Sequence, residues 1–331
     1  MKAICYENTK TTLPNWNPND HLHQKLKFGY AYERNNFFVH FYGSSMGVQT
    51  ISPGLTVIEK NKEGISLEEW AEKTFGAQNI KKMKSKVGEV KKGIWEPGLY
   101  YTYEIYNSLD ISEKESLEER QSLYMIIKKL DDILLYIEPS DKSLKVYSHE
   151  LRNLLILSCT EVENQMVALL KKRNITPIRG KYQMNDYVKL IRMTDIKKYK
   201  IIFKNYDILK NVIPFKLWSV NKPSQSLKWY NAYNLTKHNR SENFSQATFL
   251  NVINSVAANI ILYCIRFSPY ALLHEQDMLS SYIKQMVNIE FCNDCKQNFY
   301  IPLLRIPEGC REDLFVFNSY EENCYEEWKQ V

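Results

Sequence analysis

The spacing of apolar residues along the first third of the chain is that of strands. From Phe28 to Lys60, aromatic and β-branched residues alternate with other residues, and glycine and proline interrupt the pattern. We expect two or three antiparallel strands there. Ser66 is followed three positions later by Glu69, which is the pattern of a capping box and predicts a short helix to about Phe75. Strand character returns from Lys91 to Tyr106.

Beyond residue 110 the apolar spacing becomes helical. Apolar residues recur at helical spacing from Ser116 to Ile137, and again from about Ser148 to Lys172. Ser226 is a good N-cap for a helix that reaches His238. Ser245 or Thr248 then opens a strongly apolar helix that ends at Phe267, before a proline.

These patterns predict an α+β protein. Residues 1–110 would form a small α+β domain on an antiparallel sheet, and residues 111–270 a mainly helical bundle. Residues 271–331 would form a short mixed C-terminal extension, with a helix near 275–289. A chain of 331 residues is long enough for two domains of ordinary size, each with its own core.

Composition favours an intracellular protein without a membrane segment. The hydrophobic share of 44% and the charged share of 25% are those of a globular protein. The first residues lack the pattern of a secretory signal, and asparagines interrupt the apolar stretch from Phe249 to Phe267. Seven unevenly spaced cysteines suit a reducing compartment. We therefore expect a cytoplasmic protein and no membrane partner.

The positive charge is concentrated in one segment. The net charge is only +6, but between Lys171 and Lys210 twelve Lys and Arg residues stand against three Asp residues. Tyrosines are interleaved with them, and such a mixture can bind a phosphate backbone and stack on bases. The other interpretation is a solvated helical face. The residues predicted to bind RNA are Lys181, Arg192, Lys197, Lys198 and Lys200.

A polar cluster stands where a core helix would be apolar. The stretch from Trp229 to Arg240 places Asn234 and His238 on one helical face. On the preceding long helix, Glu161 falls on the stripe that should pack inward, and a buried carboxylate needs a partner. The cluster could supply that partner, either as a site or as a polar network that fixes helix packing. The candidate partners are Asn234, Lys237, His238 and Arg240.

Residues 233 to 238, Tyr-Asn-Leu-Thr-Lys-His, resemble the Arg-polar-x-x-x-His signature of the HEPN superfamily. These are all-helical ribonucleases of toxin–antitoxin, abortive-infection and CRISPR-associated systems, and the order of elements agrees over about residues 145–270. Asn234 and His238 match the signature, whereas Tyr233 stands at the arginine position. Arg240 would then have to supply the cation, with Arg152 as a second candidate.

The resemblance implies a four- or five-helix bundle that forms a homodimer and cleaves RNA without a metal or other cofactor. The family's histidine and arginine act at the ribose 2′-hydroxyl and the scissile phosphate. The chain would be a bacterial defence or toxin effector, in which the N-terminal domain senses or restrains, with a regulatory protein as a further partner. The implied catalytic set is Glu161, Tyr233, Asn234, Lys237, His238 and Arg240.

Two other hypotheses stay open. Tyr233 in place of the arginine favours a catalytically inactive HEPN-like module that dimerises or binds RNA or protein. A zinc-stabilised nucleic-acid-binding protein is the other, with Cys292 and Cys295 as half of a metal site and Cys310 and Cys324 as distant candidates. Glycine-rich phosphate-binding and serine-hydrolase motifs are missing from the sequence, which argues against nucleotide hydrolysis and serine-hydrolase chemistry.

Overall fold

The computed structural model describes residues 1–10, 28–43, 51–98, 107–273, 275–292, 296–306, 315–317 and 329–331. It contains two compact units. The first consists of Met1–Lys91, Glu96–Ser108 and Asn293–Val331, and the second of Lys92–Trp95 and Leu109–Cys292. With 48% helix and 18% strand, and an antiparallel sheet that precedes the helices, the predicted α+β class is confirmed.

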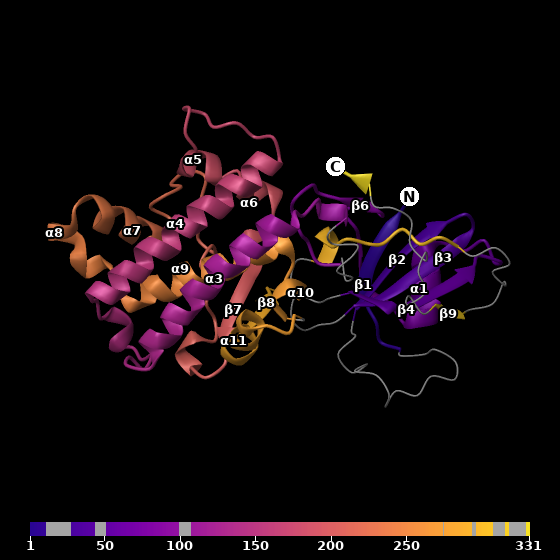
Figure 1. Ribbon diagram of the computed structural model, residues 1–331. Helices are drawn as coiled ribbons and strands as arrows, with labels where there is room; N and C mark the ends of the chain where they lie inside the picture. The colour runs from indigo at the N-terminus through magenta and orange to yellow at the C-terminus, as the bar shows by residue number, and fades with distance from the viewer. Residues whose placement is uncertain are drawn as a thin grey trace. The chain divides into compact units, whose positions relative to one another are not determined.

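The first unit is built on a six-stranded antiparallel sheet with the order β5-β1-β2-β3-β4-β9 (Figure 1). Its strands are β1 Ala3–Glu7, β2 Phe28–Arg34, β3 Phe37–Gly43, β4 Ile51–Lys60, β5 Gln78–Lys82 and β9 Phe315–Phe317. The segment from Phe28 to Lys60 thus forms three antiparallel strands, as its alternation predicts.

The turn between β2 and β3 is fixed by two asparagines. Arg34 pairs with Phe37, so the turn holds only Asn35 and Asn36, with φ of 50° and 66°. A two-residue hairpin turn with both φ values positive matches the twist of the strands, and asparagine tolerates this conformation better than most residues. The turn therefore sets the register that places Phe38 in the core.

The helix α1, Leu67–Phe75, covers the core of this unit. Its capping box forms as predicted: Glu69 N–H donates to the Ser66 hydroxyl, and Ser66 N–H donates to the Glu69 carboxylate. The helix ends at Gly76 in the left-handed region, with φ of 58°. Trp70 stacks on Phe38 with ring centroids 4.8 Å apart, so the helix and the sheet share one apolar core.

The strand predicted from Lys91 to Tyr106 is wrong for the residues that the structure describes. Residues 91–98 are turns and coil, and residues 99–106 lie outside the described part. Just before this segment lies the short strand β6, Glu89–Val90, which pairs in parallel with β10, Lys329–Gln330. Turns at residues 92–93 and 97–98 interrupt the segment, and Gly98 has a φ of 117°, which favours glycine.

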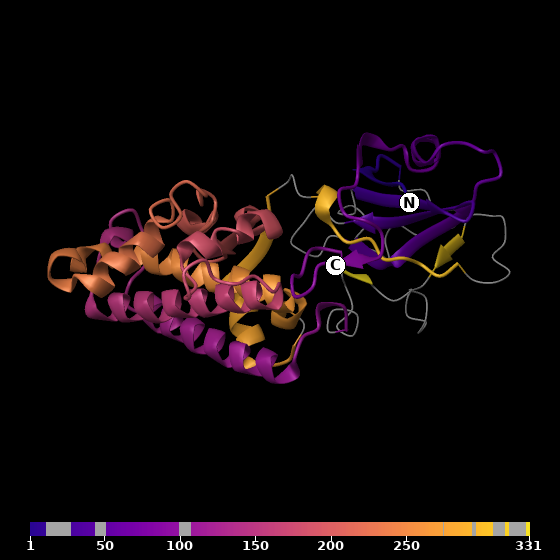
Figure 2. The same cartoon turned by 90° about the horizontal axis from the view of Figure 1, so that it is seen from above.

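The second unit is a helical bundle around the apolar helix α9, Phe249–Phe267. It contacts α3, Glu113–Leu134, α4, His149–Lys172, and α7, Lys228–His238. Figures 1 and 2 both show α3 and α4 side by side along this unit. The buried Asn259 of α9 binds α4 through Gln165 at 3.0 Å and the Ser158 hydroxyl at 2.8 Å, so the asparagine that interrupts the apolar pattern fixes helix packing.

The helix α9 is long and apolar enough to cross a membrane by length and composition, but 83% of its most apolar window is buried within the protein. This burial fits the predicted core helix. As expected, Thr248 caps its first turn, with the hydroxyl accepting from Asn251 N–H.

The basic segment is not one helix. It forms α5 Met184–Tyr187, α6 Leu190–Met193, the 3-10 turns η3 Ile196–Lys198 and η4 Asp207–Leu209, and strand β7 Tyr199–Phe203. The strand β7 pairs with β8, Val287–Phe291, which directly follows α11, Met278–Met286.

The predicted C-terminal extension is divided between the two units. Its helix, α11, is where the pattern predicts one, but α11 and β8 belong to the helical unit through the β7 pairing. Residues from 296 onward belong to the sheet unit, where Tyr300 N–H donates to Pro97 O at 2.7 Å and Leu304 N–H donates to the Tyr32 hydroxyl at 2.8 Å. These long-range bonds attach the last residues to the sheet unit, so the extension is not a separate domain.

Candidate functional site

The candidate site lies where α7 ends and the short helix α8, Arg240–Asn243, begins. Both views place this junction at one end of the helical unit (Figures 1 and 2). The helix stops at His238 because Asn239 leaves the helical region, with φ of −137° and ψ of 78°. His238 and Arg240, both exposed, stand on either side of this extended residue.

The start of α7 differs slightly from the expectation. The helix begins at Lys228 with Leu227 at the cap position, so Ser226 is not its N-cap. The Ser226 hydroxyl instead accepts from Ser219 N–H at 3.0 Å, which means that it stabilises the preceding loop. The shift leaves the face of α7 unchanged.

Arg240 contacts one residue at the start of α4 and one in the 3-10 turn η5, Phe244–Gln246. Its guanidinium lies 3.3 Å from Nδ1 of His149, the first residue of α4, and 5.7 Å from the ring centroid of Phe244. The rings of His149 and Phe244 are 4.8 Å apart. The guanidinium of Arg240 and the imidazole of His149 thus meet on exposed surface, and His238 lies two residues before Arg240 in the chain. An imidazole and a guanidinium together are suited to binding and proton transfer at a phosphate.

Arg152 has a structural task in the same region. It donates from Nη2 to the carbonyl oxygen of Thr236 at 3.1 Å, in the last turn of α7. This bond satisfies a carbonyl that the helix end leaves free. Arg152 therefore ties the first turn of α4 to the last turn of α7, and Arg240 remains the arginine that faces outward.

Tyr233, at the arginine position of the signature, is fully buried. Its hydroxyl lies 3.4 Å from Oε2 of Glu163, and Lys237 donates to the same hydroxyl at 2.7 Å. Tyr230 donates to the other oxygen of Glu163 at 2.5 Å. Tyr233 is thus part of a packed network between α4 and α7, and it cannot contact a substrate phosphate.

The charge of Glu163 perturbs the groups around it. Burial, followed by the charges of Glu163 and Asp186, raises the pKa of Tyr187 to about 12. Burial and the hydrogen bond to Glu163 raise the pKa of Tyr230 still further. The hydrogen bond to Tyr233 raises the pKa of Lys237, which keeps that lysine charged. The network therefore holds a cation beside the candidate site.

Glu161, the acid expected to face α7, lies on another side of α4. Two positions along a helix are about 200° apart, so Glu161 and Glu163 face opposite sides of α4. Glu161 follows Leu157 by one helical turn, which suggested that it faces inward. Leu157 is in fact 40% exposed, so this face of α4 is not part of the core. Burial and the neighbouring Glu119 raise the pKa of Glu161 to about 7. It belongs to a charge cluster between α3, α4 and α9, away from α7.

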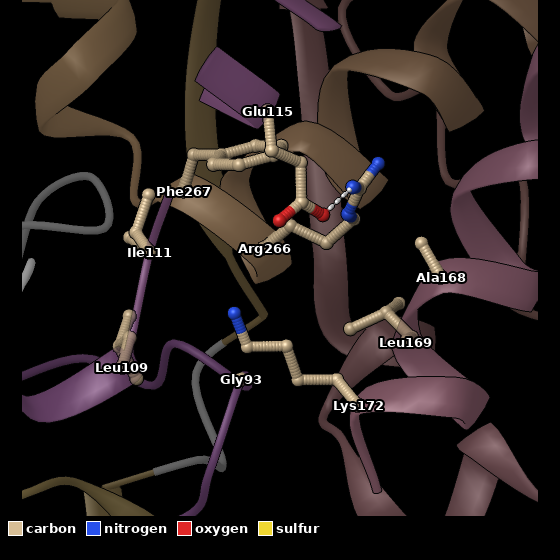
Figure 3. Close-up of a pocket in the computed structure, with 9 residues that line it drawn as sticks. All are labelled: Gly93, Leu109, Ile111, Glu115, Ala168, Leu169, Lys172, Arg266 and Phe267. Carbon is tan, nitrogen blue, oxygen red and sulfur yellow. Dashed lines mark hydrogen bonds and ion pairs between the residues drawn. The ribbon is translucent and has the colours of Figure 1, made fainter. Parts of the chain in front are cut away.

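The centre of that cluster is the buried Arg266 of α9. It forms ion pairs of 2.5 Å with Glu115 and 2.7 Å with Glu119. Figure 3 shows Glu115 and Arg266 facing each other in a pocket lined also by Lys172. The free space is about 10 Å³, room for roughly one water molecule, so the cluster is a packing feature rather than a ligand site.

The predicted RNA-binding residues do not form one continuous charged stripe. Lys198 pairs with Asp195 at 3.1 Å and Lys200 with Glu290 at 2.6 Å, whereas Lys181 and Arg192 are exposed. Lys197 is half-buried. Because acids accompany part of the set, its attraction for a phosphate backbone is weaker than the count of lysines suggests.

The predicted zinc ligands are only partly described by the structure. Cys292 is half-buried at the end of β8, and Cys295 lies outside the described residues. Within the part that is described, His, Cys, Asp and Glu side chains do not come together in any group of three that could hold a metal ion.

Two residues of the site were not singled out by sequence reasoning. Glu163 was overlooked because the apolar stripe of α4 was drawn two positions away, although its spacing of four from Cys159 puts it beside a buried residue. The other is His149, the first residue of α4. Nothing local signals its contact with Arg240, 91 positions later in the sequence.

No protein-family model, no curated protein and no solved structure matches this chain. The resemblance to the HEPN superfamily therefore stays a prediction.

Proposed function

We propose that this protein is a metal-independent endoribonuclease of the HEPN type, acting as a bacterial defence or toxin effector. The observation that carries the proposal is the α7–α8 junction, where the exposed imidazole of His238 and the exposed guanidinium of Arg240 flank one extended residue. An imidazole exchanges protons near neutral pH, and a guanidinium binds phosphate oxygens in pairs. RNA contains its own nucleophile, the 2′-hydroxyl, so these groups can act without a metal.

The roles follow from the chemistry of each group. Arg240 binds the oxygens of the scissile phosphate and stabilises the charge that develops on them. His238 exchanges a proton with the ribose 2′-hydroxyl or the leaving 5′-oxygen. Lys237, held by the Tyr233 hydroxyl, adds positive charge nearby. Tyr233 and Glu163 position Lys237, and the half-buried Asn234 lies one turn before His238 on α7.

A second candidate function is a non-catalytic module of the same type that dimerises or binds RNA or protein. The observation that favours it is the buried Tyr233, because the signature's arginine would stand there. In this alternative the junction still binds phosphate, but it does not cleave.

The test is cleavage of total RNA and of a labelled oligoribonucleotide in the presence of EDTA. We expect products with 2′,3′-cyclic or 3′-phosphate ends. The substitution His238→Ala should lower the rate by about 10²- to 10⁴-fold, the usual contribution of a positioned acid or base. Arg240→Ala should lower it by about 10²-fold or more, through lost charge stabilisation.

Lys114→Ala is the matched control, because it removes a positive charge from an exposed lysine of α3 outside the junction. It should cleave like the wild type. Cleavage that needs a divalent metal would contradict the mechanism. Binding of RNA without cleavage, lost in Arg240→Ala, would instead favour the non-catalytic module.

A further inference from the structure

Cleavage of RNA through its 2′-hydroxyl needs two proton transfers. One proton leaves the attacking 2′-oxygen, and another reaches the departing 5′-oxygen. The attacking and leaving oxygens lie roughly in line on opposite sides of the phosphorus atom. A single imidazole cannot contact both at once, so a site with only His238 lacks half of the acid–base chemistry.

A second imidazole is present at the junction. The described part of the chain contains three histidines, and one of them, His40, is buried in the sheet unit with Nδ1 bound to the Tyr6 hydroxyl. The other two, His149 and His238, are both exposed and both adjoin Arg240. His238 is two residues before Arg240 in the sequence, and His149, which is 91 positions before Arg240, contacts its guanidinium.

Several contacts fix the place of His149. Arg152, one turn along α4, binds the carbonyl oxygen of Thr236, two residues before His238. Ahead of the helix, Phe249 N–H donates to Val146 O at 2.9 Å, and Tyr147 pairs with Thr248. The first turn of α4 is therefore attached to the ends of both α7 and α9, which keeps the two histidines at one end of the bundle.

The contact with Arg240 also fixes the hydrogen-bonding state of His149. An arginine has only donors, so Nδ1 accepts, and the proton of the neutral ring sits on Nε2. The other charged groups in the adjoining turns are Glu150 and Arg152 of α4, Lys237 of α7, and Glu242 of α8, which accepts from Asn239 Nδ2 at 2.6 Å. Nδ1 is thus held by a phosphate-binding group, and Nε2 carries the proton.

We infer that His149 is a second catalytic residue of this site, the general acid that protonates the leaving 5′-oxygen. The inference rests on the proposed function and deepens it. A bound phosphodiester draws the guanidinium of Arg240 to its oxygens, which frees Nδ1 of His149 to take a proton from water. The resulting imidazolium then donates its Nε2 proton.

The step is balanced. His238 takes the 2′-hydroxyl proton as the 2′-oxygen forms its bond to phosphorus. The bond from phosphorus to the 5′-oxygen breaks, and that oxygen takes the proton of His149. The products are a 2′,3′-cyclic phosphate and a free 5′-hydroxyl, with His238 protonated and His149 neutral. Exchange of protons with water restores the site.

The experiment compares two substrates of one sequence, an ordinary oligoribonucleotide and one with sulfur in place of the bridging 5′-oxygen. A thiol has an ordinary pKa of about 8.5, so a thiolate leaves without being protonated. His149→Ala should slow cleavage of the oxygen substrate by about 10²- to 10⁴-fold and of the sulfur substrate by less than about 10-fold. His238→Ala should slow both, and Lys114→Ala neither.

A structural role for His149 would not produce this split, because misplacement of Arg240 slows both substrates. His149→Asn, which keeps an acceptor for Arg240, should behave like His149→Ala. Unchanged cleavage of the oxygen substrate in these variants, or equal losses on both substrates, would overturn the assignment while leaving the ribonuclease in place. A wild type that cleaves neither substrate would overturn the proposed function itself, and this assignment with it.

Discussion

The charge cluster around Arg266 should make the stability of the helical unit depend on pH, whatever the function of the protein. Three carboxylates, those of Glu115, Glu119 and Glu161, surround one buried guanidinium, so the cluster carries an excess of negative charge. Burial and Glu119 raise the pKa of Glu161 to about 7, from an ordinary value of 4.5. Oε2 of Glu119 is buried and accepts no hydrogen bond from the described residues. A protonated Glu161 would supply the missing donor.

The sign of the pH dependence follows from proton binding. Between pH 4.5 and 7 the folded state holds a proton on Glu161 that the unfolded state has lost. The contribution of this group to the free energy of unfolding therefore falls as pH rises through that range. Glu161→Gln removes the titration and offers an amide N–H to Glu119. A satisfied buried acceptor is worth about 1–3 kcal/mol, and partial exposure of residue 161 reduces the expected gain to about 1–2 kcal/mol at pH 8.

The assay is urea unfolding of the full chain at pH 5 and pH 8. Glu161→Gln should be more stable than the wild type at pH 8 and close to it at pH 5. Glu118→Gln makes the same chemical change at a side chain that is 67% exposed, and should change stability by less than about 0.5 kcal/mol at either pH. If Glu161→Gln gains nothing at pH 8, or if its gain is equal at both pH values, the assignment of the proton to Glu161 is refuted.

Two further substitutions test the packing of the helical unit. Arg266→Met should lower the free energy of unfolding by about 3 kcal/mol or more, because it leaves Glu115 and Glu119 without their cation, and a melting temperature equal to the wild type would contradict the ion pairs. Tyr230→Phe removes the 2.5 Å hydrogen bond to Glu163 and should cost about 1.5–3 kcal/mol in urea unfolding, whereas Tyr282→Phe, a substitution of the same kind on α11, should cost less.

The sequence by itself determined the elements whose cause is local. The capping box at Ser66, the N-caps at Ser148 and Thr248, and the alternation from Phe28 to Lys60 each depend on residues a few positions apart. Such signals act within one helix or hairpin, and the structure has these elements where the pattern places them. The paired asparagines of the β2–β3 turn belong to the same class.

The position of the motif helix was also visible in the sequence, but its surroundings were not. Periodicity predicted that Glu161 of α4 would face α7, and this was wrong, because Glu163 contacts α7 and Glu161 lies beside Glu119 and Arg266. Which neighbouring helix covers each face of α4 depends on the packing of the whole bundle. Leu157 suggested that the face of Glu161 is buried in the core, but Leu157 is 40% exposed.

Only the tertiary structure decided the features that join distant segments. It places His149 beside Arg240, divides the C-terminal residues between the two units, and buries Tyr233 against Glu163. The physical reason is that apolar spacing fixes which face of an element is buried, whereas the partner of that face depends on the packing of the whole chain. The sequence thus determines which chemical groups are present, and the packing determines which of them are in contact.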